Sequence, residues 1–149
     1  MLRTLACGLC LASFCLAQES KLIVSPADPV HIKPGATATA TLKVTTLPGF
    51  HVNSDKPKDE FLIPLKLTWS DGPLEVKAVT YPTPETIKVG KDVLSVFTGS
   101  FNIATEFKAP QSASRGTSAM AGKLRYQACN NQMCFRQSTV DVRVPVEIE

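Results

Sequence analysis

The 149-residue chain lacks the features that identify several large classes of protein. A formal net charge of only +3 gives no support for a nucleic-acid partner. No nucleophile elbow, phosphate-binding glycine loop or metalloprotease motif is present, so hydrolase chemistry has no support. No apolar run reaches the length of about 20 residues that spans a bilayer. What remains is a chain of one domain's length whose chemistry must come from a small number of residues.

The longest apolar run lies at the start of the chain. "MLRTLACGLCLASFCLAQES" has a basic residue at Arg3, an apolar stretch from Leu5 to Leu16, and small residues at Cys15 and Ala17. This pattern is typical of a secretory signal peptide. We therefore expect a signal peptide over residues 1–17, cleavage near Ala17/Gln18, and a soluble exported or periplasmic domain over residues 18–149.

Cysteine is scarce in the remaining domain. Only Cys129 and Cys134 remain after residue 17, within "YQACNNQMCFRQ" (Tyr126 to Gln137), and an oxidising compartment favours a bond between them. Such a ring of six residues removes only about 2 kcal/mol of unfolded-state entropy. A domain of about 130 residues buries roughly two-thirds of its unfolded surface without any cross-link. The pair is therefore a weak staple, and a metal site or a redox couple are the other interpretations.

Alternation of apolar and polar residues dominates the domain. It is clearest over residues 36–46, 62–69, 95–103, 119–128 and 138–148, and turn signals rich in glycine and proline separate these runs. No stretch shows helical periodicity. The sequence predicts a single all-β domain, an immunoglobulin-like antiparallel β-sandwich of seven to nine strands.

The register next to the cysteines is inconsistent in a simple hairpin. A four-residue loop over 130–133 sets Cys129 opposite Cys134, but it also sets Leu124 opposite Thr139, although paired residues share a face. A one-residue bulge between Phe135 and Thr139 would correct this mismatch. An offset between the two cysteines is the alternative, and both alternatives predict an irregularity beside the pair.

Positive charge surrounds the pair in sequence. No Asp or Glu occurs from residue 108 to residue 140, whereas Lys123, Arg125 and Arg136 lie in that window. Lys123 and Arg125 share the alternation of Cys129, so we expect them on its face, where positive charge would favour the thiolate. The alternative is that they are ordinary solvated strand residues.

Apolar residues flank the second cysteine. Met133 and Phe135 would shield the sulfurs, form a docking patch, or fold back on the core. A Cu(I) site built from Met133, His51 and the two thiols is the competing chemical interpretation. Structural zinc sites use four ligands in tight pairs, which this chain does not supply, and we expect neither a metal nor a cofactor.

Four segments resemble the N-terminal periplasmic domain of the thiol:disulfide interchange protein DsbD. They are "LPGFHVNSDKP" (47–57), "YPTPE" (81–85), "LSVFTGSFNI" (94–103) and "LRYQACNNQMCFRQSTVDVRVPV" (124–146). The resemblance implies an immunoglobulin-like sandwich in which Cys129 and Cys134 cycle between dithiol and disulfide. It also implies that reducing equivalents pass between thioredoxin-like periplasmic partners, one the electron donor and one the acceptor. Of the two sulfurs, we expect that of Cys129 to be the one that partners attack or share in a mixed disulfide.

A cap loop covers the cysteine pair in this family when no partner is docked. The matching segment is residues 89–96, with Val93 and Leu94 as its apolar tip. With Phe97, Tyr126, Met133 and Phe135, these residues form our candidate cap and docking surface.

The chain departs from the family in several respects, and residues near His51 and Asn53 replace tyrosines of the family. Four residues separate the cysteines instead of five, and the family's acidic-aromatic cap motif is missing at the expected position. We also expect electrons to come from a separate partner. The leading hypothesis is a monomeric thiol:disulfide oxidoreductase component. The alternative is a non-catalytic protein-binding sandwich with a structural disulfide.

Overall fold

A computed structural model describes residues 19–149, so the expected signal peptide lies outside the described part of the chain. Within that range the secondary structure consists of strands and loops, and no helix could cross a membrane. The strands are β1 (Leu22–Val24), β2 (Val30–Ile32), β3 (Thr37–Thr46), β4 (His51–Asn53), β5 (Lys66–Trp69), β6 (Glu75–Thr80), β7 (Glu85–Val89), β8 (Asp92–Thr98), β9 (Ser100–Lys108), β10 (Gly116–Tyr126), β11 (Ala128–Cys129) and β12 (Ser138–Ile148).

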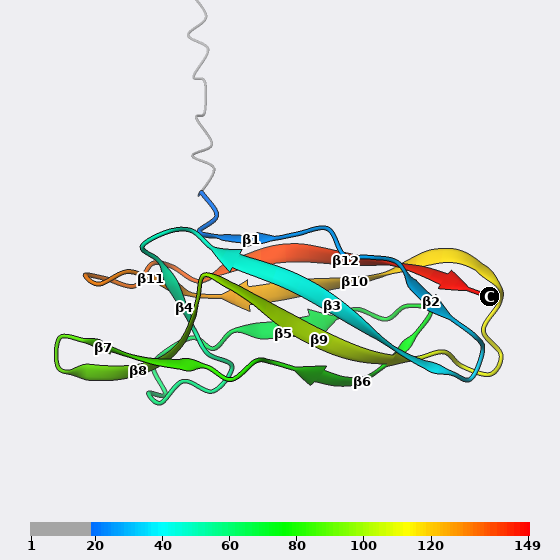
Figure 1. Ribbon diagram of the computed structural model, residues 1–149, viewed down its shortest axis with the longest axis horizontal. Helices are drawn as coiled ribbons and strands as arrows, with labels where there is room; N and C mark the ends of the chain where they lie inside the picture. The colour runs from blue at the N-terminus through cyan, green and yellow to red at the C-terminus, as the bar shows by residue number, and fades with distance from the viewer. Residues whose placement is uncertain (1–18) are drawn as a thin grey trace, which may run out of the picture.

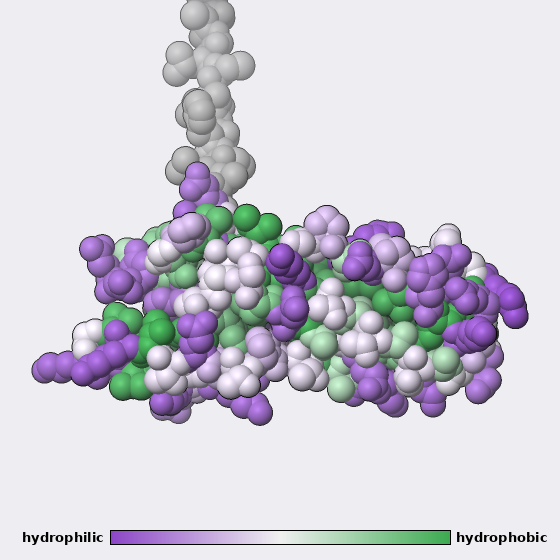
Figure 2. All heavy atoms as spheres, viewed as in Figure 1, coloured by the Kyte–Doolittle hydropathy of each residue, from purple (hydrophilic) through white to green (hydrophobic). Residues whose placement is uncertain are grey.

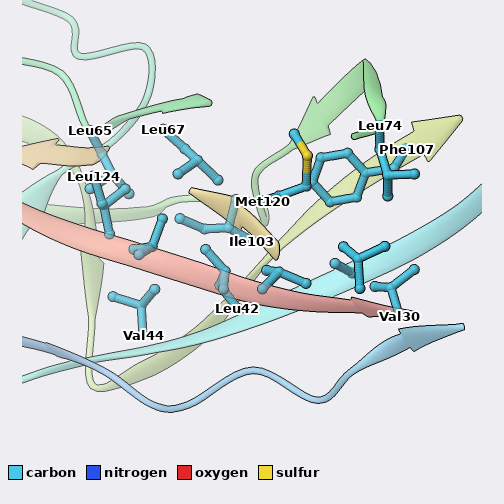
Figure 3. Packing of buried hydrophobic residues seen from close by; sticks show 14 of the residues in the cluster. Val30, Leu42, Val44, Leu65, Leu67, Leu74, Ile103, Phe107, Met120 and Leu124 are labelled. Carbon is cyan, nitrogen blue, oxygen red and sulfur yellow. The ribbon is translucent and has the colours of Figure 1, made fainter. Parts of the chain in front are cut away.

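Two four-stranded sheets form the body of a β-sandwich. One has the order β1-β3-β9-β6 and the other β2-β12-β10-β5. Their facing residues share one hydrophobic core, in which Leu42 and Ile103 of the first sheet meet Leu124 and Met120 of the second (Figure 3). The predicted all-β sandwich is therefore confirmed.

A third sheet, with the order β11-β4-β8-β7, extends the sandwich at one end. It forms because long strands of the two main sheets continue into it after a short break: β3 leads to β4, β8 leads to β9, and β10 leads to β11. The loop that carries the cysteines, the turn before β4 and the β7–β8 hairpin all lie at this end, away from the C-terminus (Figure 1).

These breaks explain why the predicted number of seven to nine strands is wrong. The run 95–103 was expected to be one strand, but Gly99, with a φ of 60°, separates β8 from β9 and moves the chain from the third sheet to the first. Left-handed φ values are accessible to glycine at little cost. The alternation itself is correct, since Ile103 is fully buried and Phe101 packs against the core.

Candidate redox site

Cys129 and Cys134 form a disulfide at the end of the molecule that carries the third sheet. Their sulfurs are 2.00 Å apart and their Cα atoms 4.0 Å apart. Cys129 lies in β11 and is only 1% exposed, whereas Cys134 is exposed. The expectation that partners attack Cys129 does not fit this arrangement, because the burial of β11 removes its sulfur from solvent.

The predicted bulge beside the pair is present. Cys129 lies directly opposite Cys134, and Tyr126 pairs with Ser138. Two residues separate these pairs on the outgoing strand, and three, 135–137, separate them on the returning strand. The extra residue sets Leu124 opposite Val140, so core residues face core residues, and the simple offset is not needed.

Asn130 shapes the turn between the cysteines. Its Oδ1 accepts hydrogen bonds from the backbone N–H groups of Gln132 (2.8 Å) and Met133 (2.9 Å). The N–H of Asn130 donates to the carbonyl of Met133 at 2.9 Å. Asparagine is favoured at such positions because its side chain satisfies backbone donors two or three residues further on. Asn130 was not among the predicted site residues, although an asparagine at the start of a four-residue loop is a recognisable turn signal.

Gln127 connects the bulge to the neighbouring strand β4 and to the loop that follows it. Its Nε2 donates to the carbonyl of Phe135 at 3.1 Å, and its Oε1 accepts from Asn53 Nδ2 at 3.1 Å and from the N–H of Ile63 at 3.2 Å. Asn53 Nδ2 also donates to the carbonyl of Ile63 at 3.0 Å. These contacts join three separate chain segments beside the strand that carries Cys129.

Phe135 packs against an aromatic residue that was not among the predicted site residues. Its ring lies 5.7 Å from that of Phe50, in the turn before β4, and Lys21 Nζ lies 5.4 Å from the Phe50 ring centroid. Phe135 is half-buried in this arrangement. Of the alternatives for the two flanking residues, Phe135 therefore folds back onto the protein, whereas Met133 is 56% exposed at the loop tip.

His51 lies directly opposite Cys129 in the pairing of β4 with β11. It is 4% exposed, its Nε2 has no hydrogen-bond partner among the described residues, and burial lowers its pKa below the ordinary value. Across residues 19–149 no group of three His, Cys, Asp or Glu side chains is placed to hold a metal ion. The Cu(I) interpretation would also need free thiols, which the disulfide does not offer.

The candidate cap is the β7–β8 hairpin. The hairpin belongs to the same sheet as Cys129, with β4 between β8 and β11, which sets β8 about 10 Å from β11. Val93 is 46% exposed and Leu94 half-buried, and hydrophobic side chains gather over this hairpin (Figure 2). Cys134 remains exposed, so the hairpin does not bury it.

A hollow of about 470 Å³ separates the hairpin from the cysteine loop. Residues 46–51 line it on one side, residues 87–89 of β7 on another, and Asn131 of the cysteine loop borders it. The cap and the redox loop are thus neighbours across an open hollow.

Two of the predicted docking residues are wrong. Phe97 is 2% exposed and stacks on Phe101 with ring centroids 4.8 Å apart. Tyr126 is also 2% exposed, and its hydroxyl lies 3.1 Å from Ser20 Oγ. Both face the core in the alternation of their strands, which a docking surface cannot use.

The predicted electrostatic residues lie on a different sheet from Cys129. Lys123 and Arg125 are exposed on β10 of the second sheet, whereas Cys129 lies on β11 of the third sheet. Lys123 Nζ also forms an ion pair with Asp141 at 2.7 Å, just beyond the acid-free window. Arg136 lies in the bulge, is exposed, and lines a hollow together with Phe135 and Tyr126. Of the three predicted cations it is the one in the segment that carries Cys134.

The comparison with known families now decides the identity of the domain. Residues 18–145 match the family model described as "Thiol:disulfide interchange protein DsbD, N-terminal". The chain belongs to this family. The DsbD N-terminal family was the one that the four sequence segments resembled, and the match covers the whole sandwich except the end of β12.

Two solved structures show a fold similar to that of this DsbD N-terminal domain. The N-terminal periplasmic domain of ScsB from Proteus mirabilis has a TM-score of 0.57 and 17% identity, over 83% of this chain. The DsbD N-terminal domain of Neisseria meningitidis in its reduced form has a TM-score of 0.50 and 11% identity, over 76% of this chain and 82% of its own. This chain spans 44% of the ScsB chain. A search of curated protein sequences gives no match.

Proposed function

We propose that this domain exchanges disulfides with thioredoxin-like partners through the Cys129/Cys134 couple, in the periplasm or another compartment that exported proteins reach. The observation that carries the proposal is an exposed sulfur in a small ring, presented at one end of a sandwich with its own core. A ring of six residues contributes little to stability, and exposed disulfides are the ones that exchange. Membership of the DsbD N-terminal family supports the same chemistry.

The exposure of the two sulfurs sets the order of events in this proposal. A partner thiolate attacks Cys134 Sγ, the bond between the two sulfurs breaks, and its electron pair goes to Cys129 Sγ. A second thiol of the partner, as its thiolate, then attacks the mixed disulfide and releases Cys134. The partner leaves oxidised, and this domain holds two electrons and two thiols. Transfer to an acceptor runs the same steps in reverse.

The surface around the disulfide has exposed apolar side chains and a positive charge that a docking partner could contact. Met133 on the cysteine loop and Val93 on the hairpin both expose apolar surface at the end of the molecule that carries Cys134 (Figure 1). Arg136 supplies an exposed positive charge two residues after Cys134. Apolar patches of this kind on a small protein mark interaction surfaces.

Reduction of the disulfide by reduced thioredoxin tests the proposal. We expect thioredoxin to open the Cys129–Cys134 bond at least about tenfold faster than the same concentration of dithiothreitol, because a docked protein thiol is positioned and a small thiol is not. Met133→Ser should slow the thioredoxin reaction and leave the dithiothreitol reaction unchanged. Equal rates for the two reductants in the wild-type protein would instead favour a binding module with an inert disulfide.

A further inference from the structure

Cys129, His51 and Thr98 form a row across the third sheet. Cys129 on β11 pairs with His51 on β4, and His51 pairs with Thr98 on β8. Directly opposite residues of antiparallel strands share a face, with Cβ atoms about 5 Å apart. The neighbours on the other face, Val52 and Ala128, belong to the hydrophobic core, so the row lies on the face away from it.

His51 is the unusual member of this row. It is 4% exposed, and its Nε2 is buried without a hydrogen-bond partner in residues 19–149. Buried polar atoms of folded proteins nearly always have a partner, so an exception needs an explanation. Burial lowers the pKa of the ring, which keeps it neutral at neutral pH and able both to donate and to accept a proton.

A carboxylate lies at the far end of the row. Thr98 Oγ1 donates a hydrogen bond of 2.8 Å to Glu85 Oε1, which leaves the hydroxyl's lone pairs on offer to a donor such as an imidazole N–H. Lys88 of β7 lines the same hollow as His51. Glu85 therefore ends the row on the side of the hairpin, Lys88 borders the hollow, and the redox pair faces His51 from β11.

Cys129 becomes a buried thiolate when the disulfide opens, and such a thiolate is a poor leaving group unless it is stabilised or protonated. Its sulfur receives the electron pair of the broken bond, yet the residue is only 1% exposed. Burial in apolar surroundings raises the pKa of a thiol, and a leaving thiolate departs more slowly as its pKa rises. The three predicted cations lie elsewhere, on β10 or in the exposed bulge, so His51 is the titratable side chain directly opposite this sulfur.

We propose that His51 is the general acid and base of the couple: it passes a proton to Cys129 as the disulfide opens and takes it back as the disulfide closes. The inference rests on the exchange function proposed above. As the bond to Cys134 breaks, one imidazole nitrogen gives its proton to Cys129 Sγ and the other takes one from solvent. One solvent proton is thus consumed for each disulfide opened at this sulfur, and closure returns it.

Alkylation of Cys129 in the reduced Cys134→Ser variant tests the inference without a partner protein. The pH dependence of iodoacetamide labelling is followed on the peptide that contains Cys129 by mass spectrometry. His51→Leu should raise the midpoint of this profile by about one pH unit, which is a tenfold loss of reactive thiolate at neutral pH. The matched control is His31→Leu, because His31 is an exposed histidine on β2 beside Glu147 and Glu149.

A midpoint that is the same in the His51→Leu and His31→Leu variants would overturn the inference. His51→Gln should raise the midpoint by less than His51→Leu does. An amide still donates a hydrogen bond to the thiolate, but it cannot transfer a proton between solvent and the sulfur. If His51→Leu does not fold, Thr98→Val takes its place, with a smaller upward shift expected and an unchanged midpoint counting against the row. Thioredoxin exchange is measured separately, so a shifted midpoint without exchange would contradict the proposed function and leave the role of His51 standing.

Discussion

Replacing Gln127 with alanine removes the side chain that joins the cysteine strand to its neighbours. Three hydrogen bonds are lost, from Nε2 to the Phe135 carbonyl and from Asn53 and the Ile63 N–H to Oε1. The carbonyl of Phe135 and the N–H of Ile63 lose these partners, whereas Asn53 Nδ2 keeps its bond to the Ile63 carbonyl.

The loss can be estimated bond by bond. A hydrogen bond within a protein contributes about 1 kcal/mol net, and a buried group left without a partner costs more than that. Three bonds would give about 3 kcal/mol, but these bonds are partly buried and water can replace some of them, so we expect the free energy of unfolding to fall by about 2 kcal/mol. For a domain of this length that lowers the Tm by about 7 °C.

Urea unfolding of the oxidised protein, followed by far-UV circular dichroism, measures this change. The control is Gln137→Ala, since Gln137 is an exposed glutamine of the same bulge whose side chain makes no hydrogen bond within the described residues. That variant should stay within about 0.5 kcal/mol of wild type, as surface substitutions usually do. A loss below about 0.5 kcal/mol for Gln127→Ala as well would refute the idea that this glutamine fixes the bulge.

Three further predictions concern the pair and its neighbours. In the reduced protein, iodoacetamide should label Cys134 at least about tenfold faster than Cys129, because one is exposed and the other is 1% exposed; similar rates would contradict the assigned order of attack. Asn130→Ala removes two hydrogen bonds that fix the turn, so the equilibrium constant for forming the Cys129–Cys134 disulfide in a glutathione buffer should fall about fivefold. Asn131→Ala should leave this constant unchanged. Burial lowers the pKa of His51 from 6.5, so the unfolded chain takes up the proton first, and stability should fall as pH drops below 6.5. Urea midpoints across that range should lose this component in His51→Gln, and a profile identical to wild type would count against a buried neutral ring.

Alternation predicted the body of the fold because each main strand has one face in the core. The run 138–148 coincides with β12, and its inward residues from Val142 to Ile148 are buried. The third sheet was not predicted, because two of its strands are very short and several do not alternate. β4, for example, has three consecutive buried residues and so shows no alternation. The break at Gly99 was missed because the pattern of buried residues continues through it.

The cysteine pair and its bulge could be predicted because they follow from counting residues around a loop. Their surroundings could not, since His51 and Phe50 are distant in sequence from the cysteines and reach them only through the pairing of β4 with β11. The change of sheet after β10 was not predicted either, and it places Cys129 in a different sheet from Lys123. The window 108–140 does contain basic residues and no acidic ones, but Asp141, just outside it, pairs with Lys123 and so neutralises part of this charge.

The reduction potential of the Cys129/Cys134 couple tests the central proposal most directly. It is measured by equilibrating the protein with glutathione buffers of known ratio and counting the thiols of the two residues by mass spectrometry. A couple that exchanges electrons with thioredoxin-like proteins should lie between about −270 and −120 mV, the range of those proteins. A potential below about −300 mV, where structural disulfides resist reduction, would contradict the account.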